Sequence, residues 1–109
     1  MENIRQHVLG QRRSGRTTRM IEALPDDGDC VVVGWTAAHR LELRRAVDHM
    51  RGVGFVKFSR FVILIGDQRC DQLRGLRVPI WADHYVWEQV RAETRATLRM
   101  LGVKGEEHA

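Results

Sequence analysis

The most restrictive feature of the sequence is the run from Cys30 to Gly34, which contains three consecutive valines. It lacks the alternation of apolar and polar residues that marks a strand with one face in water. A continuous β-branched run of this length predicts a strand that is buried on both faces. Because such strands belong to parallel sheets whose crossover connections are usually helices, the run favours an α/β fold.

The segments around this run alternate between helix and strand patterns. A helix is expected over 16–24, ended by Pro25, and a second helix should begin after Thr36 and end at Gly52. Further strand-like segments are 4–9, 55–58, 61–65 and 78–82, and a last helix is expected over 85–101. This order predicts one α/β domain over residues 1–109, in three layers, with a small and mainly parallel sheet flanked by helices. Residues 103–109 are expected to form a frayed tail.

The composition is that of a folded globular protein, with 43% hydrophobic and 29% charged residues. No apolar run approaches membrane-spanning length, and the N-terminus lacks the apolar segment of a signal peptide. The two cysteines, Cys30 and Cys70, do not have the spacing of a zinc motif and are expected to be buried, reduced thiols. We therefore expect a cytoplasmic protein without a membrane partner.

The positive charge is concentrated at the start of the chain. The first 19 residues have a net charge of +4, which equals the net charge of the whole sequence. Their basic residues are Arg5, Arg12, Arg13, Arg16 and Arg19. A second set, Arg91, Arg95 and Arg99, recurs every four residues along the last expected helix. Arginine binds phosphate in a bidentate manner, so either set is a candidate contact for a nucleic-acid backbone. A solvated helix face is the more common explanation of the second set.

The stretch from Gly10 to Thr18 has the spacing of a phosphate-binding loop, with Arg16 at the position of the usual lysine. In such a loop, small residues bring backbone N–H groups around a phosphate and the next helix points its N-terminus at it. The residues expected to bind nucleotide are Gly10, Ser14, Gly15, Arg16, Thr17 and Thr18. The alternative is an arginine-rich surface turn in which Ser14 caps the helix.

Asp83 supplies the second half of a nucleotide site, because it follows the last strand-like segment. A carboxylate at the carboxyl end of a strand can bind Mg²⁺ together with the Thr17 hydroxyl. His84 and Glu88 are candidates for orienting a water molecule, and Arg74 for reaching a terminal phosphate. The structural alternatives are a helix-capping Asp83, a surface His84 and an ordinary loop Arg74.

The order of these motifs resembles that of P-loop NTPases of the helicase and large-terminase type. In particular, the chain is similar to small phage or prophage P-loop proteins that begin close to the loop and carry Asp83-His84-Tyr85 at the second motif. The resemblance covers residues 8–90 and implies binding of ATP or GTP with Mg²⁺. Two departures, Arg16 for lysine and His84 for glutamate, imply weak or absent hydrolysis. The second motor domain of helicases is missing, so the resemblance does not imply translocation.

Three functions remain open at the level of sequence. The first is a nucleotide- and Mg²⁺-binding domain with weak or no NTP hydrolysis, and the second is a basic nucleic-acid-binding module. The third is a non-enzymatic phage regulator or inhibitor that binds a host protein in the bacterial cytoplasm. The strand-like segment 4–9, which leads into the loop, is short. A homo-oligomer in which another chain completes the sheet or the site is therefore a further hypothesis.

Overall fold

The computed structural model describes residues 15–64 and 70–106. The predicted strand 4–9, Gly10 and Ser14 lie outside the described residues. Nowhere in the described ranges is there a helix with the length and apolar character that crossing a membrane requires.

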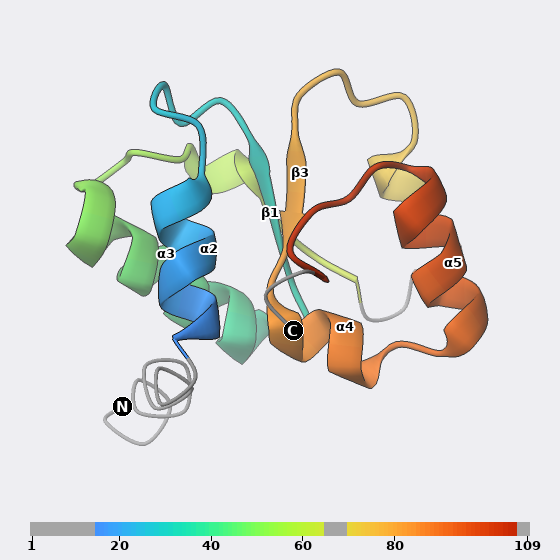
Figure 1. Ribbon diagram of the computed structural model, residues 1–109. Coiled ribbons are helices and arrows are strands. Elements are labelled where there is room, and N and C mark those ends of the chain that lie inside the picture. The colour runs from blue at the N-terminus through green and yellow to red at the C-terminus, as the bar shows by residue number, and fades with distance from the viewer. Residues whose placement is uncertain (1–14, 65–69, 107–109) are drawn as a thin grey trace.

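Three parallel strands form the sheet, in the order β2-β1-β3. Figure 1 shows β1 and β3 side by side. The strands are β1 (Val31–Gly34), β2 (Phe61–Ile63) and β3 (Ile80–Ala82). Val32 of the central strand lies opposite Phe61 on one side and Trp81 on the other. The parallel sheet predicted from the valine run is therefore confirmed, with that run at its centre.

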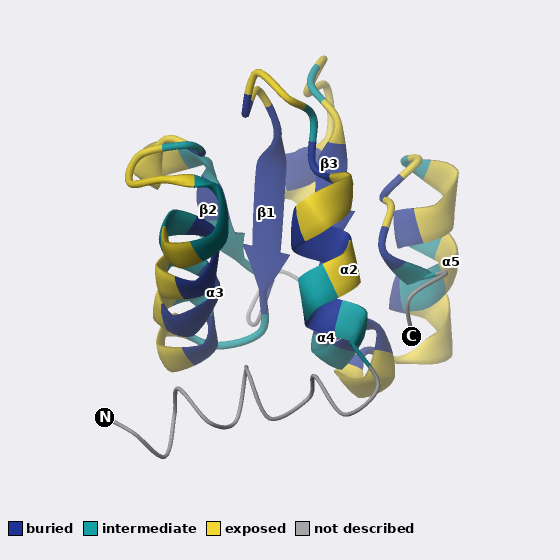
Figure 2. Ribbon diagram, turned by 60° about the vertical axis from the view of Figure 1, so that its left-hand side comes forward, coloured by how far each residue is buried: buried dark blue, intermediate teal, exposed yellow. Residues whose placement is uncertain are grey.

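Helices cover both faces of the sheet (Figure 2). They are α2 (Arg16–Ala23), α3 (Ala37–Arg51), α4 (His84–Gln89) and α5 (Ala92–Met100). Val32 packs into a core cluster with α2 and α3, whereas Val31 and Val33 pack into a second cluster with α4 and α5. Every residue of β1 is buried, which confirms the predicted burial on both faces.

The ends of α3 confirm two local predictions. Thr36 is the N-cap, and its hydroxyl accepts a hydrogen bond from the backbone N–H of His39 at 3.1 Å. Gly52 ends the helix at φ 110°, a conformation that side chains rarely adopt. The connection from β1 to β2 is therefore fixed at both ends of its helix.

The segment 55–58 is not a strand, so that prediction is wrong. It contains a bend and the start of a short 3₁₀ helix, η2 (Phe58–Arg60), and β2 begins only at Phe61. Val56 is buried in the core, but Phe58 is exposed and lies against the guanidinium of Arg44 at 4.6 Å. Burial of Val56 is enough to hold this segment against the core. The neighbouring apolar residues therefore do not need to form a strand of the sheet.

The predicted last helix is in fact two helices, because Val90 and Arg91 have extended backbones between α4 and α5. Arg95 donates from Nη2 to the carbonyl of Trp87 at 2.6 Å. This carbonyl is in the last turn of α4, where backbone carbonyls have no hydrogen-bond donor within the helix. The predicted apolar stripe is still found on the buried side, with Trp87, Val90, Thr94 and Leu98 buried. A two-residue break keeps the same positions facing the core, so periodicity does not reveal it.

The prediction of a frayed tail over 103–109 is wrong for its described part. Lys104 lies beside β3, where its carbonyl accepts from the N–H of Ala82 at 2.9 Å and its N–H donates to the carbonyl of Ile80 at 2.8 Å. Gly105 has φ 110°, and a Cβ there would lie 2.0 Å from the carbonyl oxygen of Ala82. The C-terminal segment therefore extends the sheet by one bridge, and a glycine permits the close approach.

Cys30 and Cys70 are both buried thiols and do not form a disulfide bond, as predicted. Burial, together with the nearby carboxylates of Asp27 and Asp29, raises the pKa of the Cys30 thiol to about 11. Because the thiolate is the reactive form, Cys30 is an inert core residue at neutral pH.

Candidate functional site

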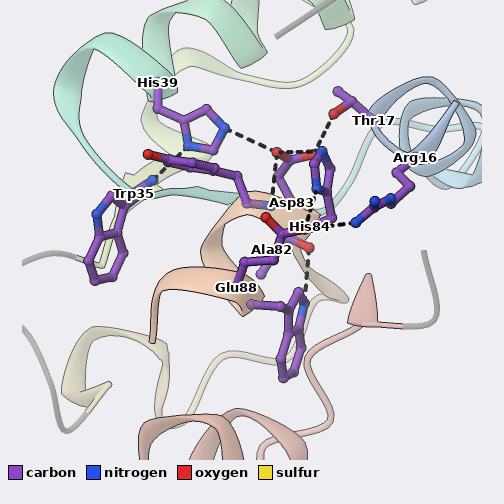
Figure 3. A network of polar contacts seen from close by, with 10 residues as sticks. Arg16, Thr17, Trp35, His39, Ala82, Asp83, His84 and Glu88 are labelled. Carbon is purple, nitrogen blue, oxygen red and sulfur yellow. Dashed lines mark hydrogen bonds and ion pairs between the residues drawn. The ribbon is translucent and has the colours of Figure 1, made fainter. Parts of the chain in front are cut away.

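The carboxyl ends of β1 and β3 and the N-terminus of α2 meet at Asp83 (Figure 3). Asp83 directly follows β3 and is 1% exposed. Thr17, in the first turn of α2, donates its hydroxyl proton to Oδ1 of Asp83 at 2.9 Å. The structure thus brings together the two residues that the sequence predicted as Mg²⁺ ligands, although 66 positions separate them.

His39 joins this pair from a third element, the first turn of α3. Its Nδ1 lies 2.9 Å from the backbone N–H of Trp35, and its Nε2 lies 3.1 Å from Oδ2 of Asp83. A backbone N–H can only donate, so Nδ1 must accept and the ring proton must be on Nε2. His39 is therefore a neutral imidazole that donates to Asp83.

Asp83 is held in its ionised form. Its burial alone would raise the pKa of the carboxyl, but the interactions with His39, His84 and Thr17 outweigh burial and hold the pKa below its ordinary value. Oδ2 also accepts from the backbone N–H of Tyr85 at 3.4 Å, so Asp83 is the N-cap of α4 as well. The helix-capping alternative is therefore correct, and it coexists with the contacts to α2 and α3.

His84 and Glu88 form the other side of the site, both from α4. Oε1 of Glu88 accepts from Nη1 of Arg16 at 2.7 Å and lies 3.4 Å from Nδ1 of His84. His84 is only 1% exposed, so the alternative of a surface histidine is wrong. Its Nε2 is buried without a hydrogen-bond partner in the part of the chain that the structure describes, and it lies 4.0 Å from Oδ2 of Asp83.

The remaining predicted site residues have separate surroundings. Gly15 is the N-cap of α2 at φ 69°, and Thr18 is half-buried beside Thr17. Arg74 is exposed next to the short helix η3 (Asp71–Leu73), and its Nε lies 3.5 Å from a carboxylate oxygen of Asp71. The site residues that meet within the described network are Arg16, Thr17, Asp83, His84 and Glu88.

The arginines of α5 are partly engaged within the molecule. Arg95 donates to the Trp87 carbonyl, and Nε of Arg99 donates to both carboxylate oxygens of Glu106, at 2.8 and 3.1 Å. Arg91 is exposed. At least two of the three guanidiniums therefore hold local structure, which favours the solvated-face explanation of this stripe.

The ligand chemistry of the site fits a hard cation. Over residues 15–64 and 70–106 there is no group of three or more His, Cys, Asp or Glu side chains that could hold a metal ion. Mg²⁺ does not need one, since it uses one or two protein oxygens and completes its shell with water and phosphate. The Thr17 hydroxyl and the Asp83 carboxylate are two adjacent oxygen groups of the kind that Mg²⁺ uses.

No family model, curated protein or solved structure matches this chain. Its function is therefore argued from the contacts at Asp83.

Proposed function

We propose that the chain is a P-loop-type domain that binds ATP or GTP together with Mg²⁺. The observation that carries this proposal is the 2.9 Å hydrogen bond from Thr17 to Asp83. It joins the hydroxyl at the start of the helix that follows the phosphate-loop spacing to the acid at the carboxyl end of a parallel strand. In open α/β sheets, ligands bind outside the carboxyl ends of the strands.

The charge of Asp83 supports a cation at this place. Its described donors are a hydroxyl, a backbone N–H and a neutral imidazole, and none of them carries a positive charge. A buried carboxylate is costly unless it is paired or binds a metal ion. When bound, Mg²⁺ would be held by Thr17 and Asp83 and would neutralise charge on the phosphates.

The start of α2 supports binding of the phosphates themselves. Its N-cap is Gly15, which has no side chain, and its first turn contains no acidic residue. The N–H groups of that turn and the helix dipole favour an anion, and Arg16 adds a guanidinium at the first helical position. These are the groups that a polyphosphate needs on the side opposite the cation.

Weak or absent hydrolysis is part of the proposal. Arg16 is already paired with Glu88, and His84 is buried beside Asp83 and not open to solvent. A water-activating group must reach the water that attacks the phosphate, and of the two candidates Glu88 already accepts from Arg16 and His84 is enclosed in the core.

Calorimetric titration with ATP and GTP, with and without Mg²⁺, tests the proposal. Arg16→Ala should weaken binding at least about tenfold, because it removes charge-assisted hydrogen bonds to phosphate. Asp83→Asn should remove most of the dependence on Mg²⁺. Arg19→Ala, on the exposed side of the same helix, is the matched control and should bind like the wild type. Wild-type binding no tighter than that of Arg16→Ala would refute the proposal.

A further inference from the structure

We infer that His39 is a positioning residue for the cation site: it fixes the Asp83 carboxylate so that Oδ1, next to the Thr17 hydroxyl, is the oxygen presented to Mg²⁺. This inference rests on the proposed function and adds to it a residue that no sequence motif indicates. Its basis is the distribution of hydrogen bonds over the two carboxylate oxygens (Figure 3).

The two oxygens of Asp83 are used unequally. Each carboxylate oxygen offers about two acceptor positions. Oδ2 accepts from Nε2 of His39 and from the backbone N–H of Tyr85, so both of its positions are taken. Among the described residues, Oδ1 accepts from Thr17 alone. The remaining acceptor position therefore lies on the oxygen that already touches the other proposed ligand.

The His39 ring is itself held in place from several directions. The N–H of Trp35 donates to Nδ1 and so keeps the ring proton on Nε2. Tyr85 packs edge-to-face against the His39 ring, with ring centroids 5.1 Å apart. Its own N–H is capped by Thr36, so its backbone position is set by the start of α3. A ring fixed in this way can neither rotate away from Asp83 nor present the wrong nitrogen to it.

A purely structural role for His39 makes a different prediction from a positioning role. If His39 only filled space and accepted the hydrogen bond from the Trp35 N–H, its loss would lower the free energy of unfolding. The metal dependence of nucleotide binding would not change. If it positions Asp83, its loss removes a hydrogen bond from Oδ2 and lets the carboxylate rotate. The affinity for the cation then falls, while binding of metal-free nucleotide at α2 is retained.

The experiment measures ATP binding as a function of Mn²⁺ concentration, and separately in EDTA. His39→Phe keeps a ring without a donor, and His39→Gln restores a donor amide. His49→Phe, at an exposed position of the same helix, is the matched control. We expect His39→Phe to weaken the Mn²⁺ dependence by about 10- to 100-fold, as for other groups that orient a metal ligand. His39→Gln should recover most of the loss, and binding in EDTA should not change.

The outcomes separate the two proposals. Wild-type protein that binds neither ATP nor GTP would overturn both. Wild-type binding with an unchanged Mn²⁺ dependence in His39→Phe would overturn the role of His39 alone. If His39→Phe does not fold, ¹⁵N NMR of the wild-type histidines decides: Mg²⁺ with ATP should shift the Nε2-protonated resonance of His39 and leave His49 unchanged, and an unshifted His39 refutes its role.

Discussion

Among single residues, the Glu88 carboxylate occupies the guanidinium of Arg16, which the proposed function would use for phosphate. It accepts from Arg16 at 2.7 Å, and Arg16 is the guanidinium that the proposed function assigns to phosphate. The pair is partly exposed, with 29% of the Arg16 side chain and 45% of the Glu88 side chain accessible. Under the proposed function, a nucleotide phosphate that binds Arg16 would have to displace the Glu88 carboxylate.

Glu88→Gln should consequently tighten ATP binding. An exposed ion pair contributes up to about 1 kcal/mol, so the expected gain is at most roughly fivefold. Glutamine keeps an oxygen that can accept from His84, so that contact is preserved. Titration calorimetry at low and high salt measures the effect, which should shrink as salt screens the pair.

Glu93→Gln is the control, because it removes a negative charge from the exposed first turn of α5. It should leave the affinity for ATP unchanged. Weaker ATP binding by Glu88→Gln would mean that Glu88 helps to hold the ligand and does not oppose it.

At the scale of elements, Arg51 ties the end of α3 to the end of α2. Its Nη1 donates to the carbonyls of Ile21, Glu22 and Leu24, at 2.9, 3.3 and 3.4 Å. The last carbonyls of a helix have no partners inside the helix, and a cation near them also interacts favourably with the helix dipole. The guanidinium also lies over the ring of Phe55 at 4.2 Å.

Arg51→Ala should lower the free energy of unfolding by about 2 kcal/mol, because it removes hydrogen bonds from a charged, mostly buried donor. Arg44→Ala is the comparison, since Arg44 is on the same helix, more exposed, and 3.9 Å from Asp48. Its loss should cost less than about 0.5 kcal/mol. Urea unfolding followed by circular dichroism measures the free energy of unfolding of both variants. Equal losses would show that the contacts of Arg51 with α2 do not stabilise the protein more than an exposed ion pair does.

At the scale of the whole molecule, the last described residues return to the centre of the fold. Lys104 pairs with β3 on the side away from β1, and its Nζ lies 5.5 Å from the centre of the Trp81 ring. Val103 is buried in the same core cluster as α4 and α5. The C-terminal segment is therefore part of the sheet, next to the strand that leads to Asp83.

Gly105→Ala should destabilise the protein by about 2 kcal/mol or more, since the added Cβ meets the Ala82 carbonyl and the backbone has φ 110°. Gly102→Ala separates the two causes: its φ is 74°, but nothing lies within 4 Å of its Cβ, so about 1 kcal/mol is expected. Thermal unfolding of both variants compares them. Equal effects would mean that the close approach to β3 does not matter.

The sequence predicted the elements whose signals are local. The valine run, the Thr36 cap and the Gly52 stop each depend on neighbouring residues, and each is found. The break at Val90 and Arg91 was not predicted, because the donor that helps to end α4 is a side chain of the next helix, Arg95. No turn residue marks the position.

The candidate site was predicted in part for a similar reason. Thr17 and Asp83 belong to motifs whose spacing can be read directly, and the structure joins them. His39 belongs to no motif, and its contact with Asp83 crosses 44 positions. One general signal was present: His39 lies in the first turn of a helix that follows a buried strand, and such turns line the carboxyl edge of an α/β sheet.

The long separation of the residues that meet at Asp83 has a consequence for folding. Contacts that span 66 and 44 positions close large loops, so the site can form only when α2, α3 and β3 are all in place. A ligand that binds there binds the native state and not its local fragments. By mass action it raises the stability of the entire chain, by about 2.7 kcal/mol at a hundred times its dissociation constant. Protection from proteolysis by Mg²⁺ and ATP would accordingly extend to cleavage sites far from the loop.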